Sequence, residues 1–140
     1  MTKKKNGTSI LPTKSQLLLY TSEDGKQRID VMLDNNTVWL SQVDLTELFQ
    51  TSKQNISLHL RNIYAEGELS RESTVKEYLT VRQEGKRQIS RRIEYYNLEA
   101  IIAVGYRVRS HRGTQFRQWA TERLNEFLVK GFVLDDERLK

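Results

Sequence analysis

The chain has 140 residues, enough for one domain with a buried core. Charged residues make up 29% of the sequence and hydrophobic residues 37%, which is typical of a globular protein with a polar exterior. The absence of cysteine excludes disulfides, thiolate metal sites and a cysteine nucleophile, and it is compatible with a cytoplasmic protein. No apolar run is long enough to cross a membrane, so we expect no membrane partner.

The net charge of +5 is concentrated in two segments. Residues 82–92 hold five basic residues and one acidic residue, whereas residues 107–117 hold four arginines and no acidic residue. Two such clusters on an otherwise acidic body favour a surface that binds a polyanion, and we expect both on one side of the molecule. The alternative is two solvated faces whose acidic partners lie elsewhere in the sequence.

The first part of the chain predicts a basic flexible tail over residues 1–16, rich in Lys, Thr and Ser. A strand is expected over residues 17–21, and apolar residues at alternate positions over residues 29–33 predict a second strand. Polar turn residues precede a short third strand over residues 37–40. The three strands together predict a small antiparallel β-meander.

The next segment predicts two helices joined by a tight turn, the pattern of a helix-turn-helix. Ser41 is a suitable N-cap, with Asp44 in the first turn of the first helix, and Ser52 can cap the second. The positions expected to face the core, from their helical spacing, are Val43, Leu45, Leu48 and Phe49 in the first helix and Ile56, Leu60 and Ile63 in the second.

Polar side chains remain outward at the start of the second helix, where they suit base edges in the major groove of DNA. We therefore predict that Lys53, Gln54, Asn55 and Ser57 contact bases. Ser52 and Arg61 are predicted to contact phosphates. The alternative is an ordinary pair of amphipathic helices packed on a core.

A second hairpin follows, with its turn at residues 83–86. Apolar residues occupy alternate positions on both of its strands, namely Val75, Leu79 and Val81, then Ile89, Ile93 and Tyr95. A hairpin with a basic tip after a helix-turn-helix is the arrangement of winged-helix proteins, whose wing contacts phosphates or the minor groove. The predicted phosphate contacts here are Arg82, Lys86 and Arg87, and the alternative is a plain surface hairpin.

Two further helices are predicted in the last third of the chain. The first is capped by Asn97, is apolar on nearly all sides and ends at Gly105, whereas the second runs from Thr114 to Gly131. Residues 135–140 resemble the start of a truncated C-terminal segment, which leaves residues 17–134 as the winged-helix-like domain.

The link between these helices carries the second basic cluster. Its arginines are predicted to contact phosphates, because such contacts need only positive charge and no catalytic group. The residues concerned are Arg107, Arg109 and Arg112.

Several segments resemble the bacterial RhuM family, which is virulence-associated and found in genomic islands. They are residues 19–26 (LYTSEDGK), 37–40 (TVWL), 96–108 (YNLEAIIAVGYRV) and 112–120 (RGTQFRQWA), followed by Lys130-Gly131 and residues 136–139 (DERL). The resemblance implies DNA binding and a chain that continues beyond the residue corresponding to Lys140. The family pattern has Ala and Gly at the positions of Thr46 and Gln50, and residues 112–120 are also similar to phage-type Bro-N and KilA-N modules.

Two other functions are compatible with the sequence. A protein-interaction module that binds a co-encoded partner could use Trp119 and Phe127 as anchors, and helix-turn-helix proteins commonly form homodimers. A phosphodiester-processing enzyme could combine Arg107, Arg109, His111 and Arg112 with Tyr95, Tyr96 or Tyr106. No metal-ligand spacing or glycine-rich phosphate loop supports the enzyme, so we expect no cofactor, metal or catalytic residue.

The sequence therefore predicts an α+β protein, with a β-meander, a helix-turn-helix, a basic hairpin and two further helices. Its predicted function is non-enzymatic binding of double-stranded DNA, as a regulator of transcription or of a mobile element.

Overall fold

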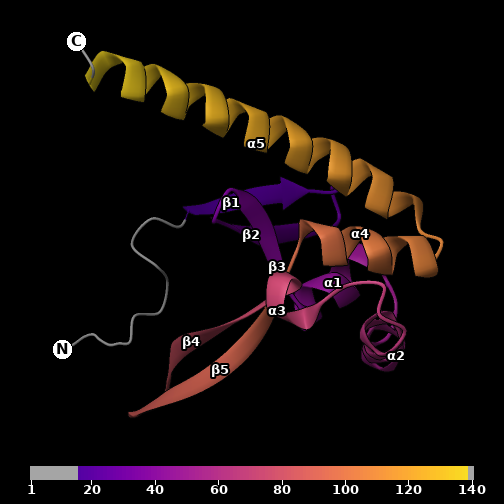
Figure 1. Cartoon of the computed structure of the whole chain (residues 1–140). Helices are drawn as coiled ribbons and strands as arrows, with labels where there is room; N and C mark the ends of the chain where they lie inside the picture. The colour runs from indigo at the N-terminus through magenta and orange to yellow at the C-terminus, as the bar shows by residue number, and fades with distance from the viewer. Residues whose placement is uncertain (1–15, 139–140) are drawn as a thin grey trace.

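A computed structural model describes residues 16–138, which form one antiparallel sheet of five strands and five helices (Figure 1). The predicted tail therefore lies outside the described residues, except for Gln16. The predicted meander is confirmed as β1 (Gln16–Thr21), β2 (Arg28–Asp34) and β3 (Thr37–Ser41). Asn35 and Asn36 both have a positive φ in the two-residue turn between β2 and β3. Asparagine tolerates this conformation, which matches the twist of a tight hairpin.

The second hairpin, β4 (Val75–Glu84) and β5 (Arg87–Asn97), joins the same sheet. The strand order is β1-β2-β3-β5-β4, which the sequence did not predict because β3 and β5 lie far apart in the chain. Pairing of β3 with β5 extends only from Trp39–Asn97 to Ser41–Tyr95. The outer part of the hairpin consequently projects away from the other strands (Figure 1).

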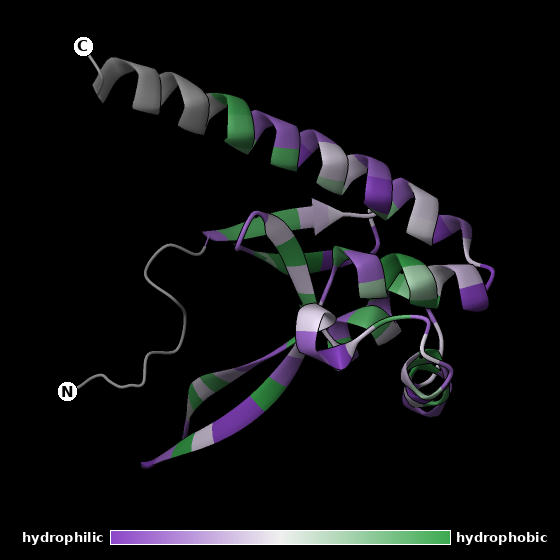
Figure 2. Cartoon of the chain, in the orientation of Figure 1, coloured by the Kyte–Doolittle hydropathy of each residue, from purple (hydrophilic) through white to green (hydrophobic). Residues whose placement is uncertain are grey.

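The register of the hairpin places its two apolar rows on opposite faces. Tyr78 is paired with Ile93, and Leu79 with Arg92, and paired residues in an antiparallel ladder point to the same face. Leu79 thus shares a face with an arginine. Tyr78 packs with Met32 and Trp39 in a small cluster. Farther along β5, hydrophilic stretches are separated by hydrophobic bands (Figure 2).

The predicted helix pair is present as α1 (Gln42–Phe49) and α2 (Lys53–Ala65), and the predicted caps are confirmed. Ser41 and Asp44 form a reciprocal capping box at α1, and the Ser52 Oγ accepts from the backbone N–H of Asn55 at 3.1 Å. All of the expected core positions of both helices are buried except Val43, which is 67% exposed. Val43 was assigned wrongly, because two residues correspond to about 200° around a helix and place it opposite Leu45.

The predicted ends of the last two helices were wrong in three places. α4 (Leu98–Arg107) continues through Gly105, and α5 (His111–Arg138) begins three residues before Thr114 and passes Gly131 without a break. Gly105 lies where α4, α5 and the ring of Phe49 meet, so its role is close packing and not termination. The structure also adds a short helix, α3 (Arg71–Thr74), before β4.

The main core lies between the helices and the β1–β2–β3 side of the sheet. Ile101 and Val104 of α4 are fully or almost fully buried there, as are Phe116 and Ala120 of α5. Tyr20 of β1 makes edge-on contacts with Phe116 and with Trp119. Trp119 is therefore half-buried and takes part in the packing between α5 and the sheet.

Candidate nucleic-acid interface

The start of α2 is held by the residues around it. The backbone turns sharply between α1 and α2 because Gln50 adopts a left-handed conformation with φ 53°. The Gln42 side chain donates to the Lys53 carbonyl at 3.3 Å and to the Ser57 hydroxyl. These bonds fix the orientation of α2 relative to α1.

The four predicted base-contacting residues fall into two groups. Lys53 and Gln54 are exposed at the first turn of α2. Asn55 and Ser57 are half-buried and already bonded within the protein, Asn55 through its Nδ2 to the Thr51 hydroxyl at 2.9 Å. Of the four, only Lys53 and Gln54 have exposed side chains, and Gln54 lies on the outer edge of the helix.

Leu58 completes this outer edge and was missed by the sequence prediction. Its side chain is 45% exposed, four residues after Gln54 and three before the exposed Arg61. This spacing puts the three residues on one stripe of the helix surface. The signal was available in the sequence, since Leu58 lies on the side of the helical wheel opposite Ile56.

Each flank of α2 borders a hollow that contains arginine. On one flank, Ser57 and Tyr64 of α2 line a hollow with Arg61 and with Arg71 of α3. On the other flank, His59 and Asn62 line a second hollow with Arg109, which follows α4. The outer edge of α2 thus lies between two basic flanks.

The arginines of the second cluster do not act as one group. Arg107 forms ion pairs with Glu66 at 2.9 Å and Glu68 at 2.7 Å, and its hydrogen bonds to these carboxylates raise its pKa. Arg112 instead reaches the β1–β2 turn, where it lies 3.1 Å from Gln27 Oε1 and 3.5 Å from Asp24. The expectation that both clusters gather on one side was therefore wrong for Arg112, because its carboxylate partner draws it away from α2.

The hairpin tip carries the first cluster on its own projection. Lys86 lies in the two-residue turn after Gly85, whose φ is 62°, and Arg87 begins β5. Both are exposed. Arg82 is paired with Ile89 in the ladder, and its side chain is outside the described atoms. Figure 1 shows the hairpin and α2 projecting as separate parts of the molecule, with α1 and α3 between them.

The tyrosines proposed for an enzyme lie in different settings. The Tyr96 hydroxyl donates to Glu94 at 3.2 Å, and burial with this negative neighbour raises the pKa of Tyr96 to about 12. Tyr96 lines the hollow on the Arg71 flank, whereas Tyr106 lines the hollow on the Arg109 flank. The structure does not bring these two groups together in one site.

Residues 16–138 contain neither a candidate metal centre nor a helix suited to a membrane. No group of three or more His, Cys, Asp or Glu side chains is arranged to hold a metal ion. No helix in this part of the chain combines the length and the apolar surface needed to cross a membrane.

The described fold defines an α+β protein in which a pair of capped helices packs on an antiparallel sheet with a projecting basic hairpin. Residues 73–140 match the sequence model of the Virulence protein RhuM family, which supports membership of the chain in this family. The match covers the hairpin, α4 and α5, whereas β1–β3, α1 and α2 precede it. No curated protein and no solved structure gives a significant match to the chain.

Proposed function

We propose that the protein binds double-stranded DNA without catalysing a reaction on it, as a cytoplasmic regulator of transcription or of a mobile element. In this proposal α1 and α2 act as a helix-turn-helix, with the outer edge of α2 in the major groove. An α-helix with its side chains is about 10–12 Å wide and fits a groove about 12 Å wide. Lys53 and Gln54 are the leading candidates for base contacts.

The observation that carries this proposal is the position of the outer edge of α2 between two basic flanks. A helix in the major groove has a phosphate backbone on each side, so cations are needed on both flanks. Arg61 and Arg71 supply one flank, and Arg109 supplies the other. Arg71 also pairs with Glu94, which reduces its contribution.

The hairpin takes the part of a wing in the proposal. Lys86 and Arg87 at its exposed tip are suited to phosphates or to a narrow minor groove. Arg107 and Arg112 become secondary candidates, because carboxylates of the same chain already neutralise part of their charge. A homodimer that reads two half-sites remains a prediction.

The decisive experiment selects duplexes from a random pool and then measures binding at several salt concentrations. We expect Gln54→Ala to relax base preference at its position by about 1–3 kcal/mol. Replacement of Gln118, an exposed glutamine on α5, by alanine is the matched control and leaves base preference unchanged.

The same assay distinguishes the loss of a specific phosphate contact from the loss of one positive charge anywhere on the protein. Lys86→Ala should weaken binding to all sequences alike and reduce the slope of log K against log salt by about one. Lys26→Ala removes an equal charge from the exposed β1–β2 turn and should leave that slope unchanged. The proposal fails if no duplex is bound even at low salt, or if Gln54→Ala and Lys86→Ala both bind selected DNA like the parent.

A further inference from the structure

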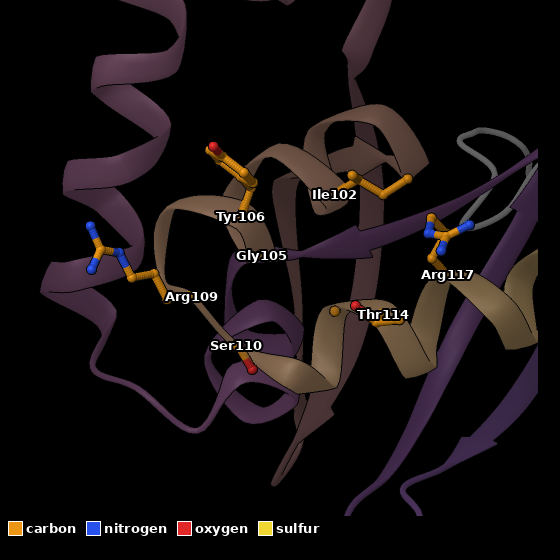
Figure 3. Close-up of a pocket in the computed structure, with 8 residues that line it drawn as sticks. Ile102, Gly105, Tyr106, Arg109, Ser110, Thr114 and Arg117 are labelled. Carbon is orange, nitrogen blue, oxygen red and sulfur yellow. The ribbon is translucent and has the colours of Figure 1, made fainter.

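A cleft of about 350 Å³ lies between α4 and the start of α5 (Figure 3). Gly105 and Gly113 form part of its lining, and a Cβ atom built at Gly105 would lie 3.5 Å from the Gly113 Cα. The two helices therefore approach closely at these glycines, with the ring of Phe49 packed against both. This approach leaves an open recess, with Ile102 at one side and Tyr106 at the other.

The apolar side chains of the cleft contribute little to the core. Tyr106 is 83% exposed, more than any other large hydrophobic residue of the described chain, and Ile102 is 37% exposed. The neighbouring Val104 and Ile101 are buried, so the packing of α4 does not depend on Tyr106. An exposed tyrosine beside a recess is typical of an interaction surface, where tyrosine and arginine are enriched.

The charges of the cleft indicate what would occupy it. Arg109 and Arg117 belong to its lining, which contains no acidic residue. Figure 3 places Arg109 on the α2 side of the cleft and Arg117 at the opposite end. The hydroxyls of Ser110 and Thr114 lie between these ends and can donate to a carboxylate. A carboxylate accepts two parallel hydrogen bonds from an arginine, so an acidic ligand complements both ends.

We infer that this cleft is a docking site for an acidic segment of a protein partner. A large apolar side chain of the segment lies on the glycine floor between Ile102 and Tyr106, and its flanking carboxylates pair with Arg109 and Arg117. A DNA backbone is the less suitable occupant, because it offers the phosphate charge but no large apolar side chain to fill the recess.

The test uses the full chain and a displayed library of random peptides. The expected result is enrichment of peptides in which Asp or Glu flanks a large apolar residue, with direct binding confirmed by fluorescence anisotropy. Tyr106→Ala and Arg117→Glu should each weaken that binding about tenfold or more, as expected for anchor residues. Leu128→Ala and Lys26→Glu, at exposed positions outside the cleft, are the matched controls and should leave the affinity unchanged.

Three results would overturn the inference. They are the absence of acidic peptides from the enriched pool, peptide binding that survives both cleft variants, and a loss of DNA binding with Arg117→Glu that exceeds the loss with Lys26→Glu. The last result would assign the cleft to a polyanion. Arg109 and Tyr106 also line a hollow beside α2, whereas Arg117 lines neither hollow, so Arg117→Glu is the variant that distinguishes failure of the peptide proposal from failure of the DNA proposal.

Discussion

The ring of Phe49 packs directly against Gly105, so that a Cβ atom added at Gly105 would lie 3.1 Å from two carbons of the ring. Phe49 ends α1 and Gly105 lies in α4, so this contact joins the helix pair to the C-terminal helices. The position of α2, which α1 holds through Gln42, thus depends on a glycine in another part of the sequence.

Gly105→Ala should lower the free energy of unfolding. Insertion of a methyl group into a packed site typically costs about 1–3 kcal/mol, and the higher helix propensity of alanine offsets about 1 kcal/mol of this. Gly113→Ala is the matched control, because its nearest ring atom would be at 3.4 Å, and it should be less destabilising. Chemical denaturation of both variants measures the difference. Equal or greater stability of Gly105→Ala would show that Phe49 can move away freely.

A second prediction concerns Gln50, which adopts a left-handed conformation with φ 53° and ψ 52°. A residue with a Cβ atom pays about 1–2 kcal/mol in this region, whereas glycine does not. Gln50→Gly should therefore stabilise the protein, by about 0.5–1 kcal/mol after the larger entropy of glycine in the unfolded chain is subtracted. Gln54→Gly, inside α2, should instead destabilise it by about 1 kcal/mol. A loss of stability in both variants would contradict the role assigned to the turn.

Local chemistry explains why much of the fold was predictable from the sequence. Ser41, Ser52 and Asn97 each cap a helix at the expected position, because a capping side chain bonds to a backbone N–H only a few residues away. The pairing of β3 with β5 was not predictable, since it joins segments more than 50 residues apart and depends on the complete core. The register of the hairpin has a local cause instead, because the two-residue turn at Gly85-Lys86 places Glu84 opposite Arg87 and so sets every later pair.

The candidate site was predictable to the same extent. Helical periodicity correctly predicted that Lys53 and Gln54 are exposed, but it could not show that the Ser57 hydroxyl is hydrogen-bonded to Gln42. It also could not show that Arg107 is paired with Glu66 and Glu68, which precede it by about 40 residues. Side chains that find distant partners must be located in the structure before they are assigned to a ligand.

Asp44 gives a prediction about pH. Burial raises the pKa of Asp44 above its ordinary value of 3.8, despite the hydrogen bonds from Ser41, and the negative charges of Glu47 and Asp30 add to the effect. The stability that the protonated carboxyl contributes is fully present below pH 3.8 and is lost as the pH rises through the raised pKa.

The free energy of unfolding of Asp44→Asn, relative to that of the parent, should consequently be higher at pH 7 than at pH 3, by on the order of 1 kcal/mol or less. Its amide oxygen can still accept the hydrogen bond from the Ser41 backbone without a buried charge. The measurement is chemical denaturation of both proteins at the two pH values. If the free energy of unfolding of the variant, relative to that of the parent, is instead lower at pH 7 than at pH 3, the ionised carboxylate stabilises the helix start.

Leu58 gives the sharpest prediction about DNA reading, and it depends on the proposed function. An exposed leucine between Gln54 and Arg61 can contact an apolar group of the DNA, and the 5-methyl group of thymine is the apolar group that the major groove displays. The thymines of a selected duplex are replaced one at a time by deoxyuridine, and each replacement removes one methyl group and nothing else. We expect one such replacement to weaken binding by the parent by about 0.8 kcal/mol, which corresponds to about fourfold.

Leu58→Ala should bind the thymine and deoxyuridine duplexes equally, whereas Leu128→Ala, which alters an exposed leucine of α5, should retain the parental difference. A parent that binds the selected duplex but is insensitive to every replacement would remove Leu58 from the reading edge while leaving DNA binding itself intact.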